Sequence, residues 1–163
     1  MFRIASLATA LLLAAAPLAA HDGVHVENAY ALTSGPGAMS GAVFFEIVNH
    51  SAESADRLIS ASSDVAQRVE LHTHLIDANG VARMIEVEDG FAVAPGETHT
   101  LQRGGDHVML MGLTRPLADG DIFELRLVFE REGEMVIEVP VDLNRAPAAG
   151  HGQGGHGAHG MGG

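Results

Sequence analysis

Soft and borderline metal ligands occur at several points of the chain, and no cysteine accompanies them. The 163 residues include ten His and seven Met but no Cys. His72 lies in the segment VELHTH, Met84 in VARM, and His107 with Met109 in DHVMLMGL. Imidazole and thioether groups together suit copper, and thioethers favour Cu(I) in particular. These residue types point to a protein that carries copper where thiols would be oxidised.

The spacing of the four residues is His72-x11-Met84-x22-His107-x-Met109. Because His107 and Met109 are two apart on an expected strand, both side chains should emerge on one face. Two imidazoles and two thioethers would form a site without a charged ligand, which should prefer Cu(I) to Zn(II). Two plainer interpretations stay open, because Met commonly fills cores and a strand His is often simply half-exposed.

The elements that must position these residues are expected to be short strands. GAVFFEIVN (41–49) is apolar and rich in β-formers, and residues 69–88 have the alternation and central turn of a hairpin. Residues 119–143 form a second expected hairpin, in which Phe123, Leu125, Leu127 and Phe129 oppose the residues between them. Eight or nine short strands with frequent turns predict an all-β fold, a β-sandwich.

The ends of the chain differ in composition from this body. Residues 1–20 have an early Arg, an apolar run and small residues, which is the order of a secretory signal peptide and predicts export to the periplasm. A membrane anchor is the alternative, although no later segment approaches eighteen apolar residues, so no membrane span is expected after cleavage. The expected organisation is a signal peptide (1–20), one domain (21–143) and a tail (144–163).

The tail is rich in Gly, Ala and His and has almost nothing to bury, so we expect disorder in the absence of metal. Imidazoles in such a chain could wrap Cu(II) together with backbone amides, whereas a merely solubilising tail is the alternative. The candidate ligands are His151, His156, His159 and Met161. Cleavage after Ala20 would also expose His21 as an N-terminal Cu(II) chelator.

Charge and composition exclude several classes of protein. The formal net charge is −12, and all nine basic residues are Arg, so nucleic acid is not an expected partner. Without Cys there is neither a disulfide framework nor a blue-copper electron-transfer site, which needs a thiolate. No nucleophile and base are arranged for catalysis, so we expect a protein that is not an enzyme.

The sequence resembles the PCu(A)C family of periplasmic copper chaperones over nearly the whole body. The resemblance is carried by GPGAMSGAVFFEIVN, DRLISASSDVAQRVELHTH, VARMIEVE and above all HVMLMGLTRPLADGD. It implies a cupredoxin-like Greek-key β-sandwich and Cu(I) ligation by His72, Met84, His107 and Met109. The first two intervals are about one residue longer than the family pattern. His74 shares a strand face with His72 and competes with it as the ligand, and we favour His72.

The resemblance also implies delivery of copper to cytochrome c oxidase, particularly to its dinuclear copper site. The expected partner is the copper-bearing oxidase subunit or a thioredoxin-like copper chaperone, and we expect this chain to be a monomer. The alternative is periplasmic copper buffering for tolerance without a dedicated acceptor, which the Gly-His tail would favour.

Overall fold

The computed structural model describes residues 23–35 and 37–146, and these residues form strands and turns without a helix. Residues 1–20 and the tail ligands from His151 to Met161 lie outside the described part, as does His21. Within the described part, no helix is long and apolar enough to cross a membrane. The ten strands are β1 (Val24–Thr33), β2 (Ser40–Asn49), β3 (Asp56–Ser62), β4 (Ala66–Ile76), β5 (Ala82–Glu86), β6 (Phe91–Val93), β7 (Thr98–Leu101), β8 (His107–Leu113), β9 (Ile122–Phe129) and β10 (Gly133–Pro140).

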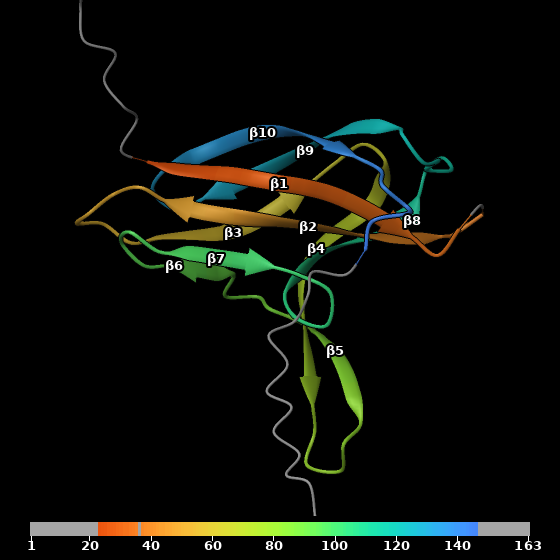
Figure 1. Cartoon of the computed structure of the whole chain (residues 1–163), viewed down its shortest axis with the longest axis horizontal. Helices are drawn as coiled ribbons and strands as arrows, with labels where there is room; N and C mark the ends of the chain where they lie inside the picture. The colour runs from red at the N-terminus through yellow and green to blue at the C-terminus, as the bar shows by residue number, and fades with distance from the viewer. Residues whose placement is uncertain (1–22, 36, 147–163) are drawn as a thin grey trace, which may run out of the picture.

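Two antiparallel sheets contain these strands, which confirms the prediction of an all-β fold (Figure 1). One sheet has the order β1-β2-β8-β4-β5, and β7 pairs with the second half of β2, beyond the part that pairs with β8. The other sheet has the order β10-β9-β3-β6. The strand count is ten rather than eight or nine because short pieces such as β6, three residues long, are separate strands between closely spaced turns.

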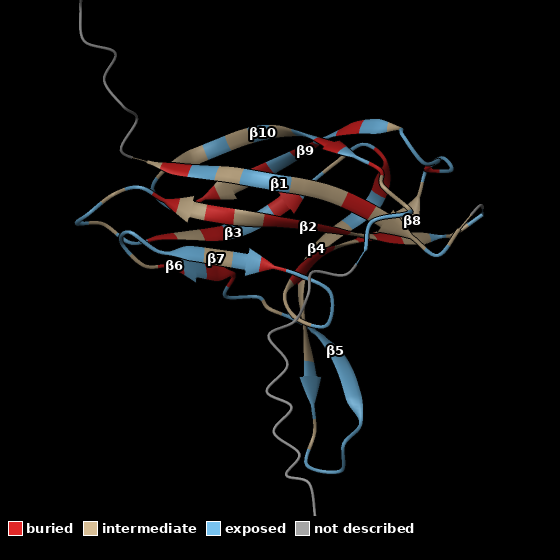
Figure 2. Cartoon of the chain, in the orientation of Figure 1, coloured by how far each residue is buried: buried red, intermediate tan, exposed pale blue. Residues whose placement is uncertain are grey.

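The core lies between the sheets and follows from the alternation of apolar residues along the strands, which is clearest in β9. In β9, Phe123, Leu125, Leu127 and Phe129 are buried, whereas most of the residues between them are exposed (Figure 2). Side chains two residues apart on a strand project from the same face, so every second residue of each strand contributes an apolar side chain to the core. The resulting cluster joins the inward residues of β2, β4 and β8 to those of β3 and β9.

The β4–β5 hairpin extends away from the sandwich, as Figure 1 shows. Leu71 near its base is 4% exposed, but Leu75 towards its tip is 50% exposed, and every residue of β5 is exposed. The turn is held by Asp77, whose Oδ1 accepts hydrogen bonds from the backbone N–H groups of Asn79 and Val81. Those two hydrogen bonds lower the pKa of Asp77 below its ordinary value, the Val81 bond most strongly.

Candidate metal site

Strand register brings the predicted ligands onto one face of the larger sheet. His72 of β4 lies opposite His107 of β8, and His74 lies opposite Met84 of β5. Residues that lie directly opposite each other in an antiparallel pair project to the same side. Met109 is two residues beyond His107, so it shares this side as well. The pairings of β4 with β5 and with β8 therefore bring together residues that are far apart in the sequence.

This ligand face is turned away from the second sheet. The neighbouring residues of opposite parity, Leu71 and Val108, belong to the buried core cluster between the sheets. Phe44 of β2 lies on the ligand face, since it is two residues from Ala42, the register partner of Met109. The sheet thus has an apolar inner side that supplies stability and an outer side that carries the imidazoles and thioethers.

A cavity of about 220 Å³ opens on the ligand face. Three of the four predicted ligands line it, and the fourth lining group with ligand character is His74 rather than His72. The remaining walls come from the ends of β1 and β2 and are apolar or small and polar. The complete lining is Leu32, Thr33, Ser34, Ser40, Gly41, Ala42, Phe44, His74, Met84, His107 and Met109.

His107 is the buried anchor of this cavity, with 2% of its surface exposed. Its Nδ1 lies 3.0 Å from the carbonyl oxygen of Gly105, which can only accept, so Nδ1 carries the proton. The lone pair therefore resides on Nε2, the atom left available to a metal. Burial lowers the pKa of His107, and the nearby His74 and His72 lower it further, although the Gly105 hydrogen bond opposes this. The imidazole is therefore kept neutral, as a ligand must be.

His74 is held against His107 in the same orientation. The two rings stack with their centroids 5.0 Å apart and their planes inclined by 30°. The Nδ1 of His74 lies 3.4 Å from the same Gly105 carbonyl oxygen, at the long end of hydrogen-bond range. This contact, too, leaves Nε2 as the atom with the free lone pair.

His72 is oriented differently. Its Nε2 donates to the carboxylate of Glu70 over 2.8 Å, and that carboxylate also receives the Arg68 guanidinium at 2.8 Å. The lone pair of His72 therefore lies on Nδ1, which is buried and has no hydrogen-bond partner. The His72 ring centroid is 5.9 Å from that of His107. An orphaned acceptor beside the cavity keeps His72 open as a ligand, although its ring does not line the cavity as described.

The two thioethers decide what kind of metal the cavity suits. No group of three or more His, Asp or Glu among residues 23–35 and 37–146 is arranged to hold a metal ion. The other groups with ligand character in the cavity lining are Met84 and Met109, and thioethers are poor ligands for Zn(II) and good ones for Cu(I). Met84 is 44% exposed, so the cavity is open towards the β4–β5 hairpin.

Sequence reasoning did not anticipate three groups at this site. The Gly105 carbonyl orients two imidazoles, Phe44 supplies an apolar wall, and Glu70 binds His72. Of these, only Glu70 left a signal in the sequence, because it has the strand parity of His72 and is two residues away. The assignment of His72 rather than His74 stays a prediction, and the tail ligands His151, His156, His159 and Met161 lie outside the described residues.

The fold and the ligand face define a cupredoxin-like β-domain with a candidate soft-metal cavity on its outer sheet face. Residues 24–141 match the family described as "Putative lipoprotein LpqE-like". The chain belongs to this family, which is the PCuAC family, as the resemblance predicted.

Relatives and solved structures agree with this membership. A lipoprotein-family relative from Leifsonia xyli is 34% identical over 120 residues, 74% of this chain and 70% of the relative. LpqE from Mycobacterium tuberculosis is 29% identical over 99 residues, and the match spans about half of its length, 52%. The copper-bound PCuAC domain from PmoF2 has a TM-score of 0.60 at 26% identity, covering 74% of this chain and 92% of that domain. Apo-DR1885 from Deinococcus radiodurans has a TM-score of 0.57 at 27% identity, covering 88% and 96%.

Proposed function

We propose that this protein is a copper chaperone that holds Cu(I) as cargo in the cavity on its outer sheet face. The observation that carries the proposal is the convergence of Met84, Met109, His107 and a second imidazole on one cavity without a carboxylate in its lining. Such a neutral, thioether-containing set matches the preference of Cu(I). The PCuAC domain from PmoF2 was solved with copper bound, and DR1885 was solved with Cu(I), which supports the proposal.

The second imidazole comes from His74 in this proposal, with His72 as the alternative that the sequence favoured. His74 lines the cavity and presents the same nitrogen as His107, because both rings direct Nδ1 to one carbonyl. His72 could replace it only by turning its orphaned Nδ1 towards the ion. The charge balance is the same in either case, since both rings are neutral ligands.

The cavity is suited to transfer because its ligands differ in exposure. Met84 is 44% exposed on the projecting hairpin, whereas His107 is 2% exposed. An incoming ligand from an acceptor can therefore displace Met84 first, while His107 and Met109 still hold the ion. Transfer to a thiolate-rich acceptor would run downhill, because thiolates bind Cu(I) more strongly than thioethers do. Stepwise ligand exchange of this kind needs no free ion in solution.

We propose that the protein acts after export to the periplasm and that its acceptor is cytochrome c oxidase, directly or through a thioredoxin-like chaperone. The related proteins from Leifsonia xyli and Mycobacterium tuberculosis are both named as putative lipoproteins, which supports export. A deletion strain distinguishes delivery from buffering. Loss of oxidase activity at low copper is expected for delivery, whereas sensitivity only at high copper would show that buffering is the function.

The copper proposal is tested by anaerobic Cu(I) titration against a competing chelator. Met109→Ala should weaken Cu(I) binding by about tenfold or more, since it removes a proposed thioether ligand that lines the cavity (a tenfold loss equals about 1.4 kcal/mol). The matched control is Met135→Ala on β10 of the other sheet, which should not change the affinity. An unchanged affinity in Met109→Ala would mean that the cavity is not the copper site.

A further inference from the structure

We propose that His99 and Asp106 are positioning residues that hold the Gly105 carbonyl in place for the copper site. That carbonyl orients the imidazoles of His107 and His74. Neither His99 nor Asp106 lines the cavity, so each acts through the backbone and not as a ligand. The inference rests on the proposed copper function, but its central claim concerns the metal-free protein and can be tested without metal.

The Gly105 carbonyl lies in the short connection between β7 and β8, which runs from Gln102 to Asp106. Inside this connection, the backbone N–H of Gly105 donates to the carbonyl oxygen of Gln102 over 3.0 Å, and Gly104 has a φ of 80°. Glycine adopts this left-handed conformation without a steric cost. The hydrogen bond closes the turn, but it belongs to the peptide group that precedes Gly105 and does not by itself direct the carbonyl.

The direction of this carbonyl depends on Asp106. The carbonyl group of Gly105 and the backbone nitrogen of Asp106 belong to one planar peptide group, so they turn together. On the other side of the group, Gly105 has no side chain and is conformationally permissive. His107 enters the ladder with β4 immediately afterwards. Asp106 therefore carries the side chain best placed to restrain the peptide group.

His99 ties the Asp106 side chain back to β7. The Nε2 of His99 lies 2.9 Å from Oδ2 of Asp106, and Nε2 donates because a carboxylate oxygen only accepts. The two side chains are 28% and 26% exposed, so the contact is partly shielded from solvent. A hydrogen bond to a carboxylate is stronger than one between neutral groups. This link joins the end of the connection to the strand that precedes it.

His99 is in turn fixed by the sandwich. Its ring stacks on that of Phe91 in β6, with the centroids 5.2 Å apart and the planes inclined by 21°. Phe91 is 4% exposed and belongs to the core cluster. The backbone of His99 lies opposite Ile47 in the ladder with β2. A continuous path of contacts therefore runs from the core through His99 and Asp106 to the Gly105 carbonyl.

The position of this carbonyl decides which nitrogen His107 offers to the cavity. While Gly105 accepts from Nδ1 of His107 over 3.0 Å, the lone pair is on Nε2. If the carbonyl turned away, the neutral ring could carry its proton on either nitrogen, and a proton on Nε2 would block that atom as a ligand. The contact with His74 is longer, 3.4 Å, and would be lost first. Breaking the link should therefore weaken copper binding without removing a ligand.

The tautomer of His107 is measured in His99→Leu and in His99→Gln. Leucine keeps an apolar group against Phe91 but removes the donor, whereas the glutamine amide can still donate to Asp106. Ring-nitrogen chemical shifts of the metal-free protein, recorded at about pH 8 where imidazoles are neutral, report this tautomer. His99→Leu should populate the form of His107 protonated on Nε2. His99→Gln should keep the form protonated on Nδ1.

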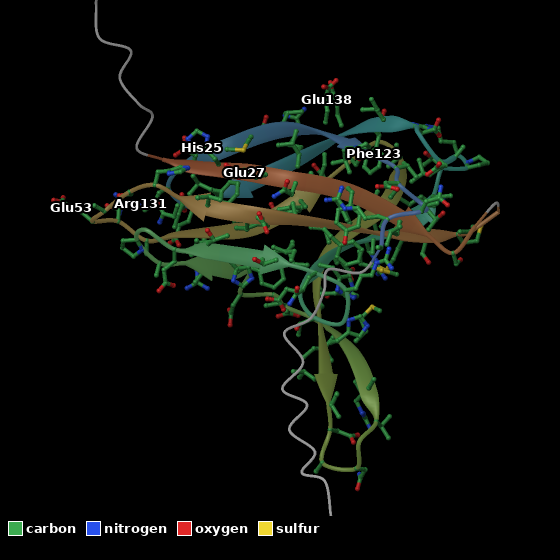
Figure 3. All side chains as sticks on the ribbon, viewed as in Figure 1. His25, Glu27, Glu53, Phe123, Arg131 and Glu138 are labelled. Atoms are coloured by element: carbon green, nitrogen blue, oxygen red, sulfur yellow. The ribbon has the colours of Figure 1, made fainter. Side chains whose placement is uncertain are left out.

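Copper affinity is measured on the same variants by anaerobic competition with a chelator. His99→Leu should bind Cu(I) about tenfold more weakly, the low end of the loss expected when a partner that orients a ligand is removed. His99→Gln should bind Cu(I) as the unchanged protein does. The control is His50→Leu, which should alter neither tautomer nor affinity. The His50 ring is 4.9 Å from that of His25, which Figure 3 shows at the end of the sandwich away from the hairpin.

A second pair of variants tests the link from the side of Asp106. Asp106→Ala removes the acceptor, whereas Asp106→Asn keeps a side-chain oxygen that accepts from His99. Both variants lose the carboxylate charge, which raises the pKa of His107, so the difference between them isolates the hydrogen bond. Asp106→Ala should shift the His107 tautomer and weaken Cu(I) binding relative to Asp106→Asn. This pair also decides the matter if His99→Leu does not fold.

Two results would overturn the inference. One is a His107 tautomer that stays unchanged in His99→Leu and Asp106→Ala, or that shifts without a change in Cu(I) affinity. The other is an equal loss of affinity in His99→Leu and His99→Gln, which would show a general loss of stability. Failure of the copper proposal is recognised separately, by an unchanged Cu(I) affinity in Met109→Ala. The tautomer comparison would still decide whether the link positions the carbonyl.

Discussion

At the scale of single residues, one backbone carbonyl selects the nitrogen that each imidazole can offer. The carbonyl oxygen of Gly105 accepts hydrogen bonds from Nδ1 of both His107 and His74, so both rings have their free lone pair on Nε2. His72 has the reverse arrangement, because Glu70 engages its Nε2 and leaves Nδ1 without a partner. At metal sites, an acceptor that bonds the other ring nitrogen of a histidine fixes the orientation and tautomer of its ring. The identity of the second imidazole ligand is therefore a question of orientation more than of residue type.

Alanine substitutions distinguish the two candidate imidazoles. His74→Ala should weaken Cu(I) binding by about tenfold or more, since it removes a ring that lines the cavity. His72→Ala should have a smaller effect and should free the Glu70 carboxylate. The measurement is the chelator competition used for Met109. If His72→Ala weakens binding more than His74→Ala does, the assignment made from the sequence is right and the one favoured by the cavity is wrong.

The lowered pKa of His107 makes the stability of the metal-free protein depend on pH. Since burial lowers this pKa below the ordinary 6.5, the unfolded chain takes up a proton at a higher pH than the folded one. The free energy of unfolding therefore decreases as the pH falls below 6.5, because the unfolded chain binds the proton first. The decrease ends once the pH is below the pKa of His107 in the folded protein. Urea unfolding near neutral pH and at about pH 5 should show this loss. In His107→Leu the pH dependence should shrink, and an equal dependence in both proteins would contradict the explanation.

At the scale of elements, the β4–β5 hairpin is the part of the site that the core does not hold. β5 is the edge strand of its sheet, and all of its residues are exposed (Figure 2). The placement of Met84 therefore depends on the ladder with β4 and on the Asp77 turn. Weakly packed elements of this kind open at low free-energy cost. Such a hairpin can move the outermost ligand without disturbing the sandwich.

Removing the carboxylate of the hairpin turn tests whether the hairpin can loosen without destabilising the sandwich. Asp77→Ala deletes the acceptor for Asn79 and Val81 and should accelerate amide hydrogen exchange in the hairpin while leaving the midpoint of unfolding nearly unchanged. Cu(I) affinity should fall, because Met84 would be less well placed. Asp121→Ala is the control, since Asp121 also accepts a backbone hydrogen bond in a turn but lies away from the cavity. Equal losses of Cu(I) affinity in the two variants would show that the effect is not local.

At the scale of the whole molecule, the two faces of the larger sheet have separate tasks. The inner face packs against the second sheet, and residues such as Leu125 of β9 are completely buried there. The outer face carries the imidazoles and thioethers. Because adjacent residues on each strand alternate between these faces, stability and ligand chemistry are encoded in the same strands without competing for positions.

A core truncation should therefore lower stability without removing the metal site. Leu125→Ala is expected to cost about 2–5 kcal/mol of unfolding free energy, as measured by urea denaturation of the metal-free protein. Ile122→Ala on the same strand should cost much less, because Ile122 is 60% exposed. Under conditions where Leu125→Ala stays folded, its Cu(I) affinity should match that of the unchanged protein. A large loss of affinity would mean that the two faces are coupled.

The alternation of apolar and polar residues in the sequence was sufficient to predict much of the fold. The alternation in residues 119–143 predicted the β9–β10 hairpin, and His72 and His74 lie on the same face of β4 as predicted. The separate strand β6 and the projection of the β4–β5 hairpin were not anticipated, since both depend on which neighbouring strands are present to pair with. Parity is a local property of a strand, whereas pairing partners are set over long stretches of sequence.

The sequence by itself determined which candidate ligand types the chain carries and the faces of the strands. His and Met without Cys predict a preference for copper, and two-residue spacing puts His107 and Met109 on one side. Only the tertiary structure decided which imidazole lines the cavity, because that depends on the register among β4, β5 and β8 and on the Gly105 carbonyl. It also brought the chain's exit at Arg145 beside Tyr30, on the ligand face. Those relations join residues far apart in sequence, and no local pattern encodes them.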